Sequence, residues 1–206
     1  MITKIYDTNP NYQDVLKVVK CLENGGIIVI PTDTLYAFAC SMNYKKAVER
    51  MAQIKGTTLE KAKFSLLCKD ISQLSEYTKP LSKEKYQLIR ECLPGPYTFI
   101  MDAGSNIPRI YQNANKTIGL RVPKNPISHA VLDMLSEPLI ATSVRILNEE
   151  METEYLTNPE LIHEIFNHKV DMVVDGGIGE DIPSTVIDCS NNNLEIVRYG
   201  KGEIEI

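Results

Sequence analysis

Short apolar runs alternate with amphipathic stretches along most of the chain. Residues 12–23 carry apolar side chains at helical spacing and are followed by Asn24-Gly25, a pattern that predicts a helix with its stop. The apolar positions of this helix are Val15, Val18, Val19 and Leu22. IIVI at 27–30 is β-branched throughout and bounded by glycines and a proline, which predicts a buried strand, and LYAFAC at 35–40 predicts a second one.

The alternation of strand and helix patterns continues through the rest of the sequence. Helices are predicted at 45–55, 70–77, 82–92, 127–135 and 159–168. Further strands are predicted at 64–68, 97–101, 117–122, 138–143, 170–174, 184–189 and 194–199. This order indicates an α/β fold, with flanking helices on a twisted sheet of mixed parallel and antiparallel strands whose antiparallel edges lie near the C-terminal end.

Composition supports a globular protein without a membrane segment. The 206 residues are 43% hydrophobic and 24% charged, and they contain neither a low-complexity tract nor a long apolar run. No linker divides the sequence, so we expect a single domain over 1–206. The first residues, MITKIYDTNP, lack the basic start and apolar stretch of a secretory signal, and we therefore expect cytoplasmic residence.

Cysteine, histidine and net charge exclude some kinds of site. The five cysteines are widely spaced without a CxxC pair, which is typical of reduced, buried thiols. The three histidines have no helical i, i+4 spacing and no nearby cysteine, so we expect no structural metal. The net charge of −5 gives no general attraction to nucleic acid, although a local basic face is compatible with it.

Polar segments interrupt the apolar strands at one kind of place, the strand ends. They are PTDT at 31–34, KGTTLEKAK at 55–63, TIGLRVP at 117–123, ATSVR at 141–145, STVID at 184–188 and RYGKG at 198–202. In α/β sheets such ends meet in a common crevice, so hydroxyls and cations would gather there and suit an anion. The cations are Lys55, Lys61, Lys63, Arg121, Arg145 and Arg198. The chain has neither GxxxxGK[ST] nor GxGxxG, so a nucleotide would be held without a glycine loop.

Each segment also has an ordinary structural interpretation. PTDT is common at strand-to-turn junctions, and a charged segment such as 55–63 is commonly a solvated loop. Arg121 within an apolar strand is often an ion-paired edge residue, and STVID can be a strand that follows a turn. The absence of GxSxG and of a serine or cysteine near a histidine argues against a covalent nucleophile.

Taken in order, six blocks of this sequence resemble the YrdC/YciO family, whose characterised members are threonylcarbamoyl-AMP synthases. The blocks are GGIIVIPTDTLYAFAC, QIKG, LPGPYTFIM, TIGLRVPKNP, PLIATS and STVIDCSNNNLEIVRYGKG, and the likeness covers about residues 12–200. The resemblance implies a twisted α/β sheet with a large concave ligand-binding face. It implies a reaction in which L-threonine, bicarbonate or CO2 and ATP, with Mg2+, give threonylcarbamoyl-adenylate and pyrophosphate for tRNA modification, followed by a separate transferase.

The resemblance also assigns expected roles to individual residues. Thr34 and Tyr36 would line the threonine pocket, and Thr117 and Arg121 would hold nucleotide or the amino-acid carboxylate. The expected catalytic residues are Lys55, Arg121 and Ser143. The expected nucleotide-binding residues are Lys55, Thr57, Lys63, Thr142, Ser143, Arg145, Ser184 and Arg198.

The sequence departs from the synthase pattern at two polar positions. Synthases of the family usually read Lys-x-Arg where this chain reads Lys55-Gly56-Thr57, and Ser-x-Asn where it reads Ser143-Val144-Arg145. These changes resemble the YciO branch, as does Cys68 where a histidine is common. One hypothesis is that Arg145 replaces the guanidinium missing at position 57. The alternative is that Arg145 pairs with Glu149 or Glu150.

The enzyme is the leading interpretation, and two others stay open. One is a non-catalytic protein that binds double-stranded RNA or tRNA through a cationic concave face. The other is an adenylating enzyme that uses a different amine. The acidic net charge and the hydroxyls of Thr34, Ser143 and Ser184 favour a small polar ligand over a long phosphate backbone.

Overall fold

The computed structural model, which describes residues 1–146 and 150–205, confirms an α/β fold built on one mixed sheet. The strands are β1 (Ile2–Lys4), β2 (Ile28–Ile30), β3 (Ala37–Ser41), β4 (Ser65–Leu67), β5 (Tyr97–Asp102), β6 (Thr117–Arg121), β7 (Leu139–Ser143), β8 (Met172–Asp175), β9 (Thr185–Asp188) and β10 (Glu195–Arg198). The helices are α1 (Tyr12–Glu23), α2 (Lys45–Ile54), α3 (Ile71–Glu76), α4 (Lys83–Cys92), the 3-10 helix η1 (Arg109–Tyr111), α5 (Pro126–Asp133), α6 (Glu154–Thr157) and α7 (Pro159–Phe166).

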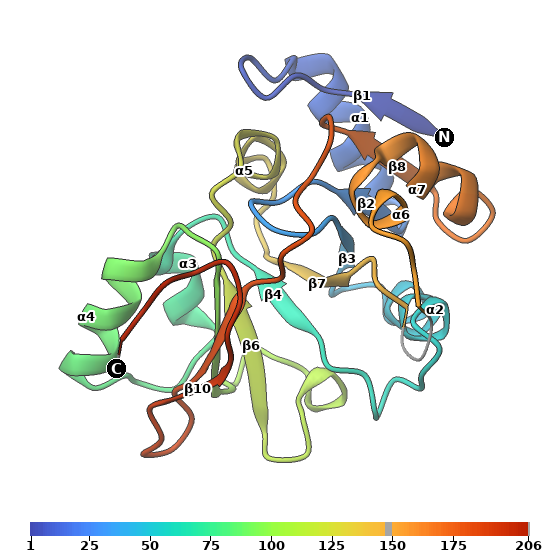
Figure 1. The fold of residues 1–206 in the computed structure, drawn as a ribbon. Coiled ribbons are helices and arrows are strands. Elements are labelled where there is room, and N and C mark those ends of the chain that lie inside the picture. The colour runs from blue at the N-terminus through green and yellow to red at the C-terminus, as the bar shows by residue number, and fades with distance from the viewer. Residues whose placement is uncertain (147–149, 206) are drawn as a thin grey trace.

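The ten strands lie in the order β1-β8-β2-β3-β7-β4-β6-β5-β9-β10 (Figure 1). Antiparallel pairs occupy the centre, because β3 pairs with both β2 and β7, and β7 pairs with β4. β9 and β10 form the antiparallel C-terminal edge that the sequence predicts. Segments far apart in the chain thus become neighbours, as when β9 runs parallel to β5.

The predicted elements are found with small shifts at their ends. The helix predicted at 12–23 is α1, whose N-cap Asn11 accepts hydrogen bonds from the backbone amides of Gln13 and Asp14. Three short elements were not predicted: β1, whose side chains are largely exposed, the 3-10 helix η1, and α6, which spans a single turn. The antiparallel centre is also absent from the sequence prediction, because strand order depends on contacts between distant segments.

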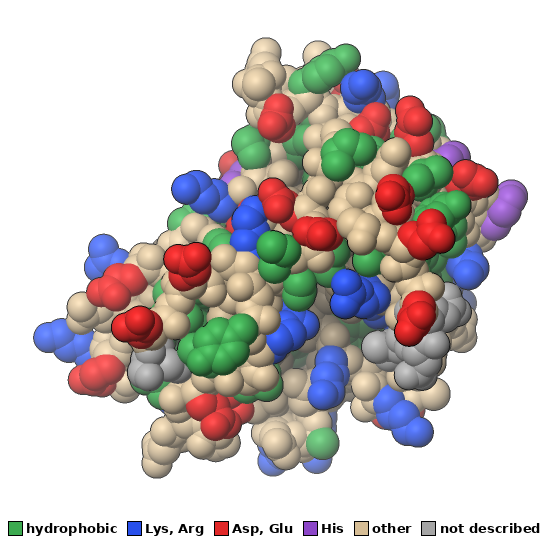
Figure 2. Space-filling view, in the orientation of Figure 1, with side chains coloured by type: hydrophobic (Ala, Val, Ile, Leu, Met, Phe, Trp, Pro, Cys, Tyr) green, Lys and Arg blue, Asp and Glu red, His purple; other side chains and the backbone are tan. Residues whose placement is uncertain are grey.

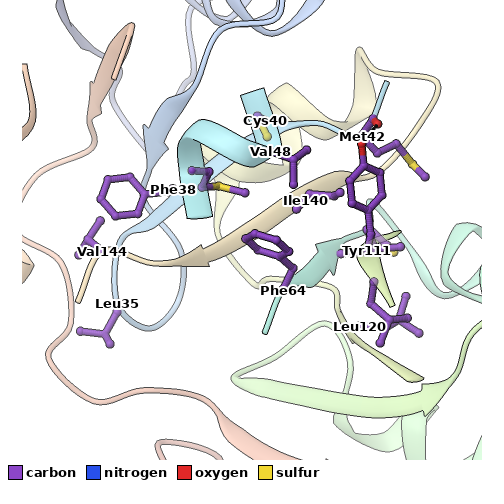
Figure 3. Close-up of a cluster of buried hydrophobic side chains, with 14 of the residues drawn as sticks. Leu35, Phe38, Cys40, Met42, Val48, Phe64, Tyr111, Leu120, Ile140 and Val144 are labelled. Atoms are coloured by element: carbon purple, nitrogen blue, oxygen red, sulfur yellow. Dashed lines mark hydrogen bonds between the residues drawn. The ribbon is translucent and has the colours of Figure 1, made fainter. Parts of the chain in front are cut away.

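The larger hydrophobic cluster lies on one face of the sheet. Helices α2 and α7 cover it with Val48, Met51 and Phe166, and Phe38 meets Phe166 edge to face at 5.0 Å between ring centroids. Figure 3 shows part of this cluster, in which Phe38, Ile140 and Phe64 come from different segments around α2. This face is therefore closed by apolar packing.

The opposite face is covered only in part. Helices α1 and α5 pack Val18, Leu22 and Val131 against strands from β8 across to β7. Farther along the same face, the adjacent strands β4, β6 and β5 carry Ser65, Gly119 and Thr98. A side chain at position 119 would contact both Ser65 and Thr98. This uncovered half of the sheet is where a polar ligand can approach.

The five cysteines carry free thiols, as predicted. Cys40, Cys68 and Cys189 are buried, and desolvation raises the pKa of Cys40 to about 12, so this thiol stays protonated. Among the described residues, none of the helices combines the length and hydrophobicity needed to cross a membrane.

Candidate anion-binding site

The PTDT segment folds into a tight polar turn between β2 and β3. Thr32 Oγ1 donates to the carbonyl of Leu35 at 2.8 Å and accepts from the amide of Thr34 at 3.1 Å, so the hydroxyl replaces a backbone partner in the turn. The hydroxyls of Thr32 and Thr34 lie 3.2 Å apart, and both residues are buried. The turn therefore presents hydroxyls at the end of a rigid strand.

Asp33, in the middle of this turn, forms a buried ion pair with Arg121 at the end of β6. The two side chains are only 10% and 9% exposed, and Arg121 Nη2 also donates to Thr32 Oγ1 at 3.5 Å. Asp33 Oδ2 and Arg121 Nε are buried without any hydrogen-bond partner among the residues that the structure describes. Each such group costs about 1–3 kcal/mol, so the pair is incompletely satisfied.

Lys55 reaches the site because α2 ends in a glycine-capped turn. Gly56 adopts φ +75°, its amide donates to the Gln53 carbonyl at 2.9 Å, and the Thr57 amide donates to the Ala52 carbonyl at 3.0 Å. These two bonds form a Schellman motif, which favours glycine at this left-handed position. The motif ends the helix at Ile54 and leaves Lys55 as its C-cap.

The Lys55 ammonium binds the end of β7 through neutral oxygens. Its Nζ donates to the carbonyls of Ser143, at 2.8 Å, and of Arg145, and lies 3.5 Å from Ser143 Oγ. Lys55 is 6% exposed. Desolvation, helped by the charge of Arg145, lowers the pKa of Lys55 to about 8. No carboxylate neutralises this ammonium among the residues that the structure describes.

Arg198 on β10 binds the start of β9 from the other side. Its Nη2 donates to the Ser184 carbonyl at 2.8 Å and to Ser184 Oγ at 3.3 Å. The Ser184 hydroxyl lies 2.8 Å from that of Thr98, which is on the uncovered face of β5. Burial lowers the pKa of Arg198, and the charges of Arg121 and Arg145 lower it further.

Lys201 connects the segment after β10 to the PTDT turn. Its Nζ donates to the Asp33 carbonyl at 3.1 Å and pairs with Glu180 at 3.0 Å. Thr185 holds this segment against the sheet, because its hydroxyl donates to the Gly202 carbonyl at 2.6 Å.

The cations named above converge on one side of the molecule. Arg145 depresses the pKa of both Lys55 and Arg198, and Arg121 depresses that of Arg198, so their charges interact across the space between the strand ends. Figure 2 shows Lys and Arg side chains gathered around a hollow near the centre of this view. We call the region that the contacts above define the cationic hollow; its residues are Asp33, Lys55, Arg121, Arg145, Ser184 and Arg198.

Other predicted site residues lie farther from these contacts. Thr142 lies opposite Phe38 of the core in the β3–β7 pair, so it faces the other side of the sheet from Ser143. Thr117 begins β6 whereas Arg121 ends it, and the side-chain Nδ2 of Asn113 donates to the Thr117 hydroxyl at 3.2 Å.

Lys63 is exposed and Thr57 is half-buried, and neither side chain makes a hydrogen bond with the described residues. Lys61 is likewise exposed, which agrees with the solvated-loop interpretation of its side chain.

Tyr36 and Cys68 point into the packed side of the sheet. The fully buried Tyr36 donates from its hydroxyl to the Gly177 carbonyl at 2.7 Å and accepts from the Gly176 amide at 3.1 Å. Its hydroxyl therefore holds the loop after β8. Cys68 belongs to the larger apolar cluster and is fully buried. A thiol there cannot replace a histidine that faces a ligand on the uncovered side.

Sequence reasoning missed several residues of the hollow. It interpreted PTDT as a polar turn but did not pair Asp33 with Arg121, and it gave no role to Thr98 or Lys201. Alternation within YTFIM could have placed Thr98 on the polar face of its strand. No local signal links Asp33 to Arg121, because 88 positions separate them.

The described residues offer no cluster of three or more His, Cys, Asp or Glu side chains that could hold a metal ion. Two surface cavities, of about 370 and 310 Å3, lie around Pro80 and around Pro138, away from the cationic hollow. Neither cavity is lined by a residue of the cationic hollow.

Comparison with known proteins gives close relatives along nearly the whole chain. An uncharacterized protein of Haemophilus influenzae is 38% identical over 199 residues, which cover 96% of this chain and 94% of the relative. Escherichia coli K12 YciO, also uncharacterized, is 36% identical over 202 residues, covering 98% and 96%. A Coxiella burnetii threonylcarbamoyl-AMP synthase is 27% identical over 167 residues, covering 81% and 87%.

Solved structures show the same fold. The crystal structure of E. coli YciO matches with a TM-score of 0.91 and 35% identity, covering 98% of this chain and 97% of that one. The crystal structure of P. abyssi Sua5 complexed with L-threonine matches with a TM-score of 0.86 and 22% identity, covering 97% of this chain and 57% of Sua5. Residues 20–200 match the family model for Sua5, YciO and YrdC, described as "Telomere recombination". The chain therefore belongs to the Sua5/YciO/YrdC family.

Proposed function

We propose that the protein is a YciO-like threonylcarbamoyl-AMP synthase, which forms threonylcarbamoyl-adenylate and pyrophosphate from L-threonine, bicarbonate or CO2 and ATP. The observation that carries the proposal is the convergence of Lys55, Arg121 and Arg198 on one hollow, beside the hydroxyls of Thr34 and Ser184. A distant relative bears the name threonylcarbamoyl-AMP synthase, and a protein of the same fold was solved with L-threonine.

The reaction makes demands that such a site can meet. The amine of threonine adds to CO2 and loses a proton, giving a carbamate whose oxygen attacks the α-phosphorus of ATP. The bond from the α-phosphorus to the bridging oxygen breaks, and pyrophosphate leaves with its electron pair. No protein nucleophile is required. Catalysis then rests on holding the reactants together and on stabilising the negative charge that moves to pyrophosphate.

Each cation has a proposed task consistent with its position. Lys55 and Arg198, which bind only neutral protein oxygens among the described residues, would bind phosphate oxygens. Arg121 and the hydroxyl of Thr34 would bind the amino acid. Ser143 and Ser184 would contact the adenylate. Mg2+ would come with the triphosphate, since Mg2+ is commonly held by substrate phosphates and water with few protein ligands.

Arg145 remains a candidate replacement for the guanidinium that Thr57 does not supply. Arg145 is exposed, and its charge reaches both Lys55 and Arg198. Of its two alternative partners, Glu149 lies outside the described residues and Glu150 is exposed. If Arg145 binds the nucleotide, Arg145→Ala should weaken ATP binding about tenfold, and Thr57→Arg in the same chain should restore part of it. An unchanged dissociation constant in Arg145→Ala would remove this role.

The test of the function is direct. Purified protein is incubated with labelled bicarbonate, L-threonine, ATP and Mg2+, and labelled threonylcarbamoyl-adenylate is separated by chromatography. We expect product that depends on both threonine and bicarbonate, with matching pyrophosphate release. Lys55→Gln should abolish it, whereas the exposed and distant Lys17→Gln should not. Pyrophosphate release with a different amine would indicate another adenylating enzyme.

The biological setting belongs to the same proposal. The adenylate would be consumed in the cytoplasm by a separate transferase that modifies tRNA, and the chain would act as a single domain over 1–206. If no adenylate forms and the protein instead binds tRNA or double-stranded RNA with strong salt dependence, the binding-protein interpretation replaces the enzyme.

A further inference from the structure

Asp33 and Arg121 form an unusual ion pair for this molecule. Both side chains are about nine-tenths buried, whereas each of the other ion pairs among the described residues has at least one exposed partner. Exposed ion pairs help to keep a protein surface soluble, but a buried pair cannot have this role. It also lies where the PTDT turn meets the uncovered face of the sheet, inside the cationic hollow.

The geometry of the pair is incomplete. A guanidinium and a carboxylate can form two parallel hydrogen bonds, but here Arg121 uses a single nitrogen, Nη2, for both Asp33 Oδ1 and Thr32 Oγ1. The second carboxylate oxygen, Asp33 Oδ2, and the second donor position, Arg121 Nε, are buried and have no hydrogen-bond partner in residues 1–146 and 150–205. Each group therefore retains hydrogen-bonding capacity that the described part of the chain does not use.

The surroundings indicate what could use this capacity. Arg121 is close enough to Arg198 for their charges to repel, while Lys55 and Arg198 bind neutral oxygens. An arriving carboxylate or phosphate would meet this excess of positive charge and would offer two oxygens to the fork of Arg121. Asp33, once displaced, would have a second cation at hand, because Lys201 already binds its backbone carbonyl.

We propose that Asp33 is a positioning residue that serves as the internal counterion of Arg121, and that an oxyanion of the ligand takes its place at the guanidinium when the ligand binds. The inference rests on the proposed function only for the identity of that oxyanion. Asp33 keeps the buried guanidinium paired and oriented while the hollow is empty. The ligand must compete with it, so Asp33 lowers the affinity of the hollow for anions.

This role predicts a gain of affinity when the charge of Asp33 is removed. Asp33→Asn keeps the size and one oxygen acceptor, so Arg121 stays near its place but is no longer neutralised. Calorimetry should show about tenfold tighter binding of an anion probe, inorganic pyrophosphate or L-threonine, than in the wild type. Damage to a merely structural residue would instead weaken binding. Equal or weaker binding of both probes by a folded Asp33→Asn protein would therefore overturn the proposal.

The probes and controls separate the remaining explanations. A gain for pyrophosphate places a phosphate at Arg121, whereas a gain for L-threonine that is lost with L-threoninol places a carboxylate there. Asp33→Glu restores the charge and should return affinity toward that of the wild type. Asp171→Asn removes a carboxylate from the exposed Arg50 pair elsewhere in the molecule and should leave binding unchanged. Arg121→Lys should cancel the gain of Asp33→Asn.

A second measurement uses the wild-type protein, in case Asp33→Asn does not fold. The side-chain Nε–H resonance of Arg121, assigned by its loss in Arg121→Lys, should shift as either probe saturates the protein. A resonance that stays unchanged, or the absence of saturable binding by both probes, would overturn the proposal. Adenylate synthesis without a gain in Asp33→Asn would refute this inference alone. Tighter probe binding by Asp33→Asn in a protein that makes no adenylate would refute the proposed enzyme alone.

Discussion

Lys55 is held in place by carbonyl oxygens. Because these partners are neutral, the charge of Lys55 is sensitive to pH. A carbonyl accepts hydrogen bonds from an ammonium but contributes only a dipole, so burial still lowers the pKa of Lys55 to about 8. The ammonium is charged below that pKa and becomes neutral as the pH rises through it. A phosphate that depends on Lys55 therefore loses a partner in mildly alkaline solution.

We expect ATP to bind about tenfold more weakly at about pH 9 than at about pH 7, because Lys55 loses its proton near its pKa of about 8. Titration calorimetry over this range is the measurement. Lys55→Gln has no charge to lose there, so its weaker affinity should vary much less with pH. An equally steep dependence in both proteins would assign the titration to another group.

Tyr36 shows how a residue implied as a ligand contact can have a different visible task. Its hydroxyl joins the Gly177 carbonyl and the Gly176 amide, and the ring is fully buried. Tyr36→Phe removes both bonds while keeping the ring, so we expect it to lower the free energy of unfolding by about 1–3 kcal/mol. Urea denaturation measures the loss. Faster hydrogen exchange of the Gly176 amide would show that the lost stability comes from this contact. Tyr6→Phe, at an exposed ring, should change neither the free energy of unfolding nor this exchange rate.

At the scale of elements, the uncovered face depends on close approach between neighbouring strands. A Cβ atom at position 119 of β6 would lie 2.5 Å from Ser65 Oγ on β4 and 3.2 Å from Thr98 Cγ2 on β5. Glycine at this position therefore lets the three strands present their polar side chains side by side. A larger residue would have to displace one of its neighbours.

We expect Gly119→Ala to destabilise the protein by about 1–3 kcal/mol through this overpacking. Chemical denaturation measures the change, and the Ser65→Ala, Gly119→Ala double variant should recover part of it, because Ser65 Oγ is the nearest obstacle. Unaltered stability in Gly119→Ala would show that the neighbours move aside at little cost.

Elements with a strong local pattern could be predicted, and those fixed by distant contacts could not. The period and the stop signal of 12–23 give α1 its observed bounds. β1 has three largely exposed residues and owes its strand to pairing with β8, about 170 positions away. In the hollow, the cations could be found as polar interruptions of apolar runs. Their partners could not, since the Asp33–Arg121 pair depends on how β2 and β6 are brought together.

At the scale of the whole molecule, charge is unevenly distributed. The net charge is −5, yet lysines and arginines gather around the hollow in Figure 2. The hollow can therefore attract an anion that the molecule as a whole repels. Salt reduces such attraction over distances beyond about 8 Å at 0.15 M and about 3 Å at 1 M.

We expect the affinity for ATP to fall steadily as ionic strength rises, while the urea midpoint changes little. Arg198→Gln should give a shallower dependence, because one of the attracting charges is removed. Titrations at several salt concentrations measure both slopes. An affinity that does not respond to salt would mean that contacts other than the cations hold the nucleotide.

The assembly of the hollow from both halves of the chain has a consequence during biosynthesis. A polypeptide emerging from the ribosome contains the PTDT turn and Lys55 long before it contains Ser184, Arg198 and Lys201. β9 can pair with β5 only after residues 185–188 have been made, and this pairing brings Ser184 beside Thr98. A nascent chain stalled before β9 would thus contain Lys55, Arg121 and Arg145 but would lack Ser184 and Arg198, and we expect it to bind nucleotide more weakly until these residues have been made.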